Sequence, residues 1–172
     1  MYFRDDFTRT HETDSVYAAI GRALSFATHF EVNCKALATV IGFEAAINDP
    51  LASFASVSEV VNRVISNQLA RHIAKICPGT DDARGILDRA RLSRNAIAHE
   101  VTLGLKSERE TTNRHDEMFL RLHTIALALA EGDRLVCLLY HVATNQQFPP
   151  ADFVREYPTR VARWVCNSLD PE

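Results

Sequence analysis

The stretch VYAAIGRALSFATHFEVNC, residues 16–34, decides the fold class of this 172-residue chain. Its apolar residues recur every three or four positions, which is the spacing of one face of an α-helix. The same pattern predicts a helix from about residue 13 to Ile47, although Gly21 and Gly42 weaken it and two shorter pieces are an alternative. The apolar face consists of Val16, Ala19, Ile20, Ala23, Leu24, Ala27, Phe30 and Cys34.

Helical spacing continues through the rest of the chain. Ser56 and Glu59 form a capping-box signature at the start of a second helix, and Thr80 is placed to cap a third. Gly132 is a candidate bend in a long fourth helix, and Pro158 is expected to interrupt the start of the last helical segment. The predicted helices cover residues 56–76, 80 to about 104, about 114–143 and about 152–169.

No stretch of the sequence has a convincing strand pattern, and the predicted helices are joined by short connections. This combination predicts an all-α fold, an antiparallel up-down bundle of four to five helices. The length favours a single domain over residues 1–172, with a core at about 13–147 and a C-terminal helical extension at about 150–170.

The composition is that of an ordinary globular protein. The chain is 47% hydrophobic and 24% charged and has a net charge of −3. Its N-terminus lacks the apolar segment of a secretory signal, and no apolar run reaches the length of a membrane span. We therefore expect a soluble, cytoplasmic protein that has no membrane partner.

The sequence offers no pattern for a bound metal or cofactor. The four cysteines, Cys34, Cys77, Cys137 and Cys166, are widely spaced and are expected to be reduced thiols. No set of His, Cys, Asp and Glu residues has metal-ligand spacing, and no glycine-rich nucleotide-binding motif is present. We therefore expect no metal and no cofactor.

The stretch RGILDRARLSRNAIAHEVT, residues 84–102, carries the candidate functional residues. A helical wheel predicts an apolar face made of Ile86, Ala90, Ile97 and Val101. A separate polar stripe holds Arg84, Asp88, Arg91, Asn95, His99 and Thr102. Asn95 and His99 can touch because they are four residues apart, whereas Arg94 lies about 140° from His99 around a regular helix.

Local charge favours an anion-binding role for this surface. Residues 63–99 contain seven Lys and Arg but three Asp and Glu, a net charge of +4, whereas the rest of the chain carries −7. A basic segment on an acidic protein is compatible with docking a phosphate backbone. Arg84 and Arg91 are the expected contacts to that backbone.

Each of these residues also has a purely structural interpretation. His99 could be only a structural histidine, and Arg91 and Arg94 could be solvent charges or partners of Asp88. On the first helix, solvated positions are favoured for Glu31 and Glu44. The alternative is that such a carboxylate faces the third helix and holds Arg94.

The segment Arg94-Asn95-Ala96-Ile97-Ala98-His99 resembles the R-x4-6-H motif of the HEPN superfamily (higher eukaryotes and prokaryotes nucleotide-binding domains), in which a polar residue follows the arginine. The motif covers six residues, and the expected helical architecture resembles a small prokaryotic HEPN protein over most of the chain. The resemblance implies a homodimer in which two copies of the motif meet across the interface. It also implies a metal-independent endoribonuclease, or a relative that only binds, in a toxin–antitoxin, phage-defence or CRISPR setting. A nucleotidyltransferase-like antitoxin is a partner that the resemblance implies.

The side chains of this motif suit RNA cleavage. The 2′-OH of RNA is the nucleophile, so the enzyme needs an acid/base group and positive charge on the phosphate. We expect His99 to act as acid/base, Arg94 to bind the phosphate and Asn95 to orient His99 or to bind the phosphate as well. Glu100 departs from the small residue found after the histidine in many members, and Val101 stands where some toxins carry a modified tyrosine.

Two other classes of function stay open on the sequence alone. Glu100 favours a catalytically inactive module that binds RNA, a nucleotide or a protein partner. A purely structural subunit of an assembly is the third alternative.

Overall fold

The computed structural model describes residues 11–48, 58, 59, 62, 68–77, 79–101 and 113–166. Within these ranges it contains no strand, which confirms the predicted all-α class. Five α-helices are described: α1 (His11–Ile47), α3 (Leu69–Ile76), α4 (Asp81–Ala96), α5 (Asn113–Ala143) and α6 (Ala151–Cys166). A π-helical segment, η1 (Ile97–Val101), follows α4 directly.

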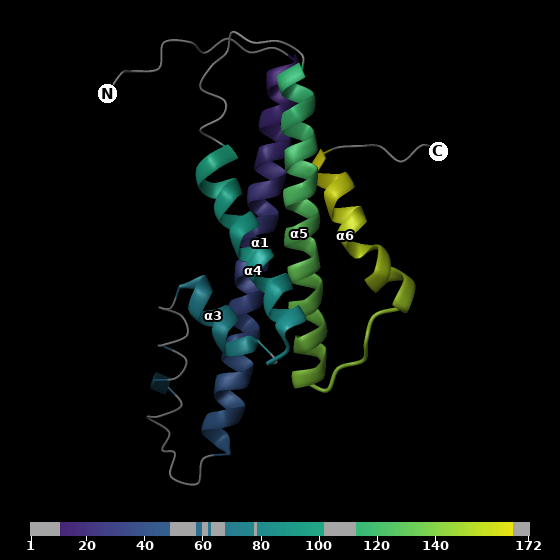
Figure 1. The fold of residues 1–172 in the computed structure, drawn as a ribbon. Helices are drawn as coiled ribbons and strands as arrows, with labels where there is room; N and C mark the ends of the chain where they lie inside the picture. The colour runs from purple at the N-terminus through teal and green to yellow at the C-terminus, as the bar shows by residue number, and fades with distance from the viewer. Residues whose placement is uncertain are drawn as a thin grey trace, which may run out of the picture.

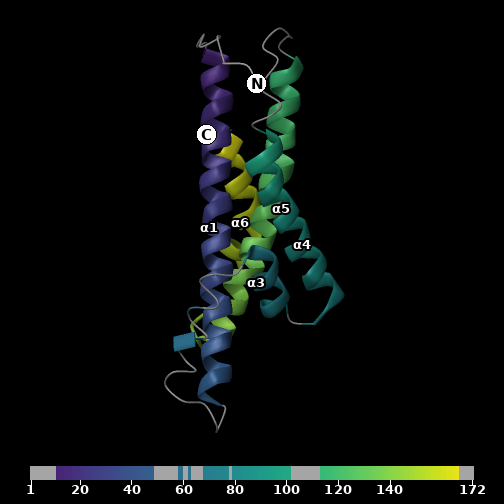
Figure 2. The same cartoon turned by 90° about the vertical axis from the view of Figure 1, so that its left-hand side faces the viewer.

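The two longest helices, α1 and α5, lie side by side at the centre (Figure 1). Helices α3 and α4 lie on one side of this pair and α6 on the other, and the view turned by 90° agrees (Figure 2). Along the chain α1, α4, α5 and α6 alternate in direction, so the arrangement is an up-down helical bundle in which α1 and α5 are parallel (Figure 1). At 1.5 Å per residue, the 37 residues of α1 span about 55 Å.

One hydrophobic core connects all five helices. Phe30 and Leu37 of α1 and Leu122 and Leu129 of α5 are fully buried at its centre. Helix α6 belongs to the same core, because Val161, Ala162 and Val165 are buried in it. The segment that the sequence suggested was an extension therefore packs as an integral helix of the bundle. The Arg22 Nε–H of α1 also donates a hydrogen bond of 2.9 Å to the Val165 carbonyl of α6.

The helix boundaries confirm some predictions and correct others. Helix α1 is continuous through Gly21 and Gly42, so the two-piece alternative is wrong. The second predicted helix is interrupted, because Gln68 has an extended backbone and α3 begins at Leu69. The predicted start at Ser56 lies outside the described residues.

Pro158 does not interrupt the start of the last helix. It lies in the middle of α6, which is helical on both sides of it. A proline in a helix gives up one backbone hydrogen bond, here the one to the Val154 carbonyl. The Pro158 ring is buried in the bundle, and burial of this apolar ring favours the uninterrupted helix.

Gly132 marks a close approach of two helices. A Cβ at this position would clash with the Ala90 Cβ of α4 and would lie 3.3 Å from Phe30 Cε2 of α1. The absence of a side chain at Gly132 therefore allows α4 and α5 to pack with their backbones close together.

Among the described residues, no helix is both long enough and apolar enough to cross a membrane.

Candidate functional site

Helix α4 positions the residues of the motif, and its start is the one that the sequence predicts. The side-chain oxygen of Thr80 accepts a hydrogen bond of 3.4 Å from the Ala83 backbone N–H. Asp81 and Asp82 occupy the first turn, where their negative charges interact favourably with the positive end of the helix dipole. These residues fix where α4 begins and thereby the register of every side chain that follows.

The face of α4 that enters the core differs from the predicted one. Leu87 is fully buried, whereas Ile86, the predicted core residue, is only half-buried. The other buried residues of α4 and η1 are Ala83, Ala90 and Ile97, and the side chain of Val101 lies outside the described set. On a wheel the buried face is therefore centred close to the direction of Arg94. Arg94 consequently points toward α1 and away from the polar stripe.

Arg94 is held by a carboxylate of α1. Its Nη2 donates a hydrogen bond of 2.8 Å to Glu31 Oε2, and Lys35 Nζ lies 3.5 Å from Glu31 Oε1. The side chains of Arg94 and Glu31 are 31% and 24% exposed, so the pair is half-buried. The alternative in which a first-helix carboxylate holds Arg94 is thus confirmed for Glu31, and the favoured solvated position is wrong. Glu44 is exposed.

The pKa of Glu31 reflects this pairing. Partial burial works to raise the pKa of its carboxyl. The hydrogen bond and the positive charge of Arg94, with a further contribution from Lys35, outweigh burial, and the net pKa is lowered. Glu31 is therefore a charged partner that orients the guanidinium.

Arg94 keeps part of its hydrogen-bonding capacity. Its Nη1 lies 3.4 Å from the Asn95 Oδ1, to which it donates a long hydrogen bond. Because a guanidinium has five N–H donors, these two bonds leave others for an additional oxygen ligand. Arg94 and Asn95, adjacent in sequence, therefore form one polar unit beside Glu31.

His99 lies in a different environment from Arg94. It is exposed and belongs to the π-helical segment η1, which begins three residues after Arg94. In a π-helical turn the backbone hydrogen bonds join residues that are five apart. Two residues five apart are therefore closer in angle around the helix axis than they would be in an α-helix. Short π-helical turns of this kind occur frequently at functional sites. The side chain of Glu100 and the predicted stripe residue Thr102 lie outside the described set.

The two other candidate arginines, Arg84 and Arg91, differ in their exposure and in their ion pairing. Arg84 is exposed near the start of α4. Arg91 is half-buried, and its Nε lies 3.4 Å from Asp88 Oδ1, which confirms the alternative of an Asp88 partner for Arg91. Such a surface ion pair contributes little stability and can exchange for a phosphate.

A second polar cluster, which the sequence analysis did not identify, ties α1, α5 and α6 together. The Asp133 carboxylate is fully buried, accepts a 2.5 Å hydrogen bond from Tyr157 Oη and accepts a 2.8 Å bond from Asn33 Nδ2. His29 Nε2 lies 3.8 Å from Asp133 Oδ2 and 3.0 Å from Asn33 Nδ2. We call these four residues the Asp133 cluster. Its signal in the sequence is that Asp133 lies four residues after Leu129 and three before Val136, on the buried face of α5.

Neither polar group has the ligands of a metal centre. In the part of the chain that the structure describes, no three His, Cys, Asp or Glu side chains are placed to hold a metal ion. Comparison of the chain with models of protein families, with curated proteins and with solved structures found no match.

Proposed function

We propose that this chain is a metal-independent endoribonuclease of HEPN type, with a toxin–antitoxin or phage-defence role. In this proposal Arg94 binds the scissile phosphate, His99 acts as acid/base and Asn95 orients or assists them. Two copies of the chain form a homodimer that brings two such motifs into one cleft. A nucleotidyltransferase-like antitoxin is a further candidate partner.

One observation carries the proposal. The motif joins a half-buried, carboxylate-oriented arginine to an exposed histidine through a π-helical turn. An arginine with a fixed side chain loses little conformational entropy when it binds a phosphate. A solvent-exposed imidazole has the access to a 2′-OH that an acid/base group needs. Arg94 thus has the fixed position that favours phosphate binding, and His99 has the solvent access that proton transfer needs.

The chemistry balances without a metal ion. The 2′-OH loses its proton to an imidazole, and its oxygen forms a bond to the phosphorus while the bond to the 5′-oxygen breaks. A protonated imidazole returns a proton to the departing 5′-oxygen. The guanidinium of Arg94 stabilises the charge on the non-bridging oxygens. The products are a 2′,3′-cyclic phosphate and a 5′-hydroxyl end.

The Arg94–Glu31 pair favours a second candidate function. A carboxylate 2.8 Å from the guanidinium offsets part of the positive charge that a cleavage site needs. The chain would then be a non-catalytic module that binds RNA through Arg84, Arg91 and the remaining donors of Arg94.

The test uses the purified protein, single-stranded RNA and EDTA. We expect cleavage that survives EDTA and leaves 2′,3′-cyclic phosphate ends, and we expect His99→Ala and Arg94→Ala to reduce its rate by at least about a hundredfold. Arg89→Ala is the matched control, because Arg89 is exposed on the same helix but off the polar stripe. Cleavage by both motif variants at the parent rate would overturn the assignment.

Binding separates the two candidates. Combined Arg84→Gln and Arg91→Gln should weaken RNA binding and lower its salt dependence, because each arginine that contacts phosphate releases counterions. Salt-sensitive RNA binding without turnover in the parent protein would select the non-catalytic module. Light scattering tests the homodimer, and a monomer that cleaves RNA would contradict the two-motif cleft.

A further inference from the structure

Helix α5 packs against α1, α4 and α6, and one of its sides faces none of them. Its fully buried residues Leu122, Leu129 and Val136 share one face of the helix. The opposite side lies open between α4 and α6 (Figure 1). At about 100° per residue, the side chains opposite the buried face fall within an arc of about 80°. We call them the outer face of α5, which consists of Leu120, Thr124, Leu127, Glu131, Arg134, Leu138 and Val142.

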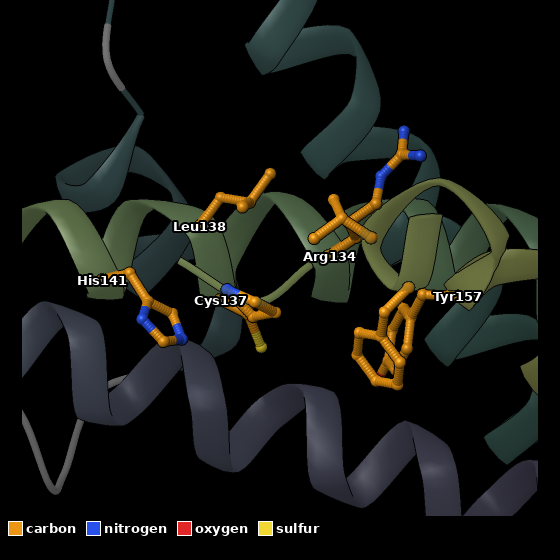
Figure 3. Close-up of a pocket in the computed structure, with 8 residues that line it drawn as sticks. Arg134, Cys137, Leu138, His141 and Tyr157 are labelled. Carbon is orange, nitrogen blue, oxygen red and sulfur yellow. The ribbon is translucent and has the colours of Figure 1, made fainter. Parts of the chain in front are cut away.

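The outer face is mostly apolar although it points to solvent. Leu120 and Val142, at its two ends, are 69% and 65% exposed, and Leu138 between them is half-buried. Leu138 and Arg134 leave α5 on the same side, away from Cys137 (Figure 3). The face extends over residues 120–142, which is about 33 Å along the helix. A continuous exposed apolar surface of this kind marks an interaction site.

The two charged residues of the outer face lie at its middle and have no partner of their own. Glu131 and Arg134 are both half-buried, and neither makes a hydrogen bond or ion pair with another described residue. Partial burial of a charge is unfavourable unless an opposite charge compensates it. A surface that presents one acidic and one basic group to this part of α5 would therefore be stabilised there.

The outer face is self-complementary when a second α5 runs in the opposite direction. A two-fold axis between residues 132 and 133 places Glu131 opposite the partner's Arg134 and Leu127 opposite the partner's Leu138. Leu120 then approaches the far end of the other α5, where Val142 and Phe148 are exposed.

The direction of the second helix follows from the same charges. In a parallel pair in register, Glu131 would face a glutamate and Arg134 would face an arginine, which disfavours association. Charge complementarity therefore selects an antiparallel copy of the same helix as the occupant of the outer face.

We propose that the outer face of α5 binds a second copy of this chain in antiparallel orientation and so forms a symmetric dimer. The contact contains two Leu127–Leu138 pairs and two Glu131–Arg134 ion pairs, one of each from either side of the axis. The outer face contains neither Arg94 nor His99. The contact is therefore distinct from the cleft proposed for RNA, and the inference stands whether or not the chain cleaves RNA.

The test is sedimentation velocity of the purified protein over a series of concentrations, without RNA. Glu131→Arg places arginines opposite one another in the dimer, and Arg134→Glu places glutamates opposite one another. We expect each variant alone to associate about a hundredfold more weakly than the parent, or less still. An equimolar mixture of the two variants restores an opposite charge at every contact, so we expect it to form a heterodimer within about tenfold of the parent affinity.

Two further variants serve as controls. Glu156→Arg makes the same change of charge at an exposed position of α6 that lies away from its buried face, and it should associate as the parent does. Leu120→Glu should weaken association without unfolding the chain, because Leu120 is exposed. Far-UV circular dichroism shows whether each variant keeps its helices.

Three results would overturn the proposal. They are a parent protein that stays monomeric at every concentration, folded charge variants that associate as tightly as the parent, and a mixture of the two charge variants that does not associate. The RNA cleavage assay decides the proposed ribonuclease separately, since association is measured without RNA.

Discussion

The contact between Gly132 and Ala90 gives the sharpest test of the packing. A methyl group at Gly132 would overlap the Ala90 Cβ. Both atoms are attached directly to helical backbones, so no change of rotamer relieves the clash and α4 and α5 must move apart. Overpacking costs about 1–3 kcal/mol, and a clash between two atoms fixed to the backbone belongs in the upper part of that range, about 2–3 kcal/mol. The better helix propensity of alanine returns about 1 kcal/mol. We expect Gly132→Ala to lower the free energy of unfolding by about 1–2 kcal/mol.

Urea unfolding followed by far-UV circular dichroism measures this loss, and two variants separate clash from helix propensity. Gly21→Ala is the matched control, because an added Cβ at Gly21 meets no atom within 4 Å, and it should stabilise the protein by about 0.5–1 kcal/mol. Adding Ala90→Gly to the Gly132→Ala variant removes the methyl group that clashes. The loss of helix propensity at position 90 in α4 then offsets the gain in helix propensity at position 132 in α5. Only Phe30 Cε2, at 3.3 Å, then has to shift. The double variant should therefore be within about 0.5 kcal/mol of the parent. If Gly132→Ala is as stable as the parent, or if Ala90→Gly restores nothing, the close approach is not what limits this position.

Three further predictions concern buried polar groups. Tyr157→Phe removes a 2.5 Å hydrogen bond to the buried Asp133 carboxylate and should cost about 1.5–3 kcal/mol in urea unfolding, and a change near zero would contradict that bond. The lowered pKa of Glu31 means that the Arg94–Glu31 pair stabilises the fold fully above the ordinary glutamate pKa and loses this effect as the pH falls below it. The stability lost in Glu31→Gln should thus shrink between about pH 7 and about pH 3, and a constant difference would contradict it. The Cys34 thiol is fully buried, and burial followed by the charge of Asp133 raises its pKa. It should react with Ellman's reagent only as fast as the protein unfolds, whereas rapid labelling of the native protein would refute this burial.

Periodicity predicted the bundle because it reports which residues a helix buries. The apolar spacing in residues 16–34 and the boundary at Thr80 identified α1 and the start of α4 closely. Gly21, Gly42 and Pro158 did not end helices, because tertiary burial outweighs local propensity in a long packed helix.

The surroundings of the predicted residues Arg94, Asn95 and His99 could not be derived from the sequence. The wheel for α4 left out Leu87, and one omitted leucine rotated the expected core face away from Arg94. The partner of Arg94 depends on how α1 is rotated against α4, which no spacing within one helix specifies. Glu31 did carry a signal, since it directly follows the buried Phe30 and precedes the buried Cys34 by three residues. A carboxylate at the edge of an apolar face is a candidate for a paired, half-buried position.

Gly132 and Asp133 are adjacent residues of α5 that contact different helices, and together they orient the candidate site. Gly132 admits α4 to close contact at Ala90, whereas Asp133 binds side chains of α1 and α6. Arg94 lies one helical turn beyond Ala90 and so leaves α4 on nearly the same side, toward α1. On α1, Glu31 adjoins Phe30, whose ring lies close to Gly132. The contacts of α4 and of α1 with α5 therefore both lie at Gly132, and together they place Arg94 and Glu31 2.8 Å apart. Core packing thus sets the direction of the Arg94 side chain as much as the charge of Glu31 does.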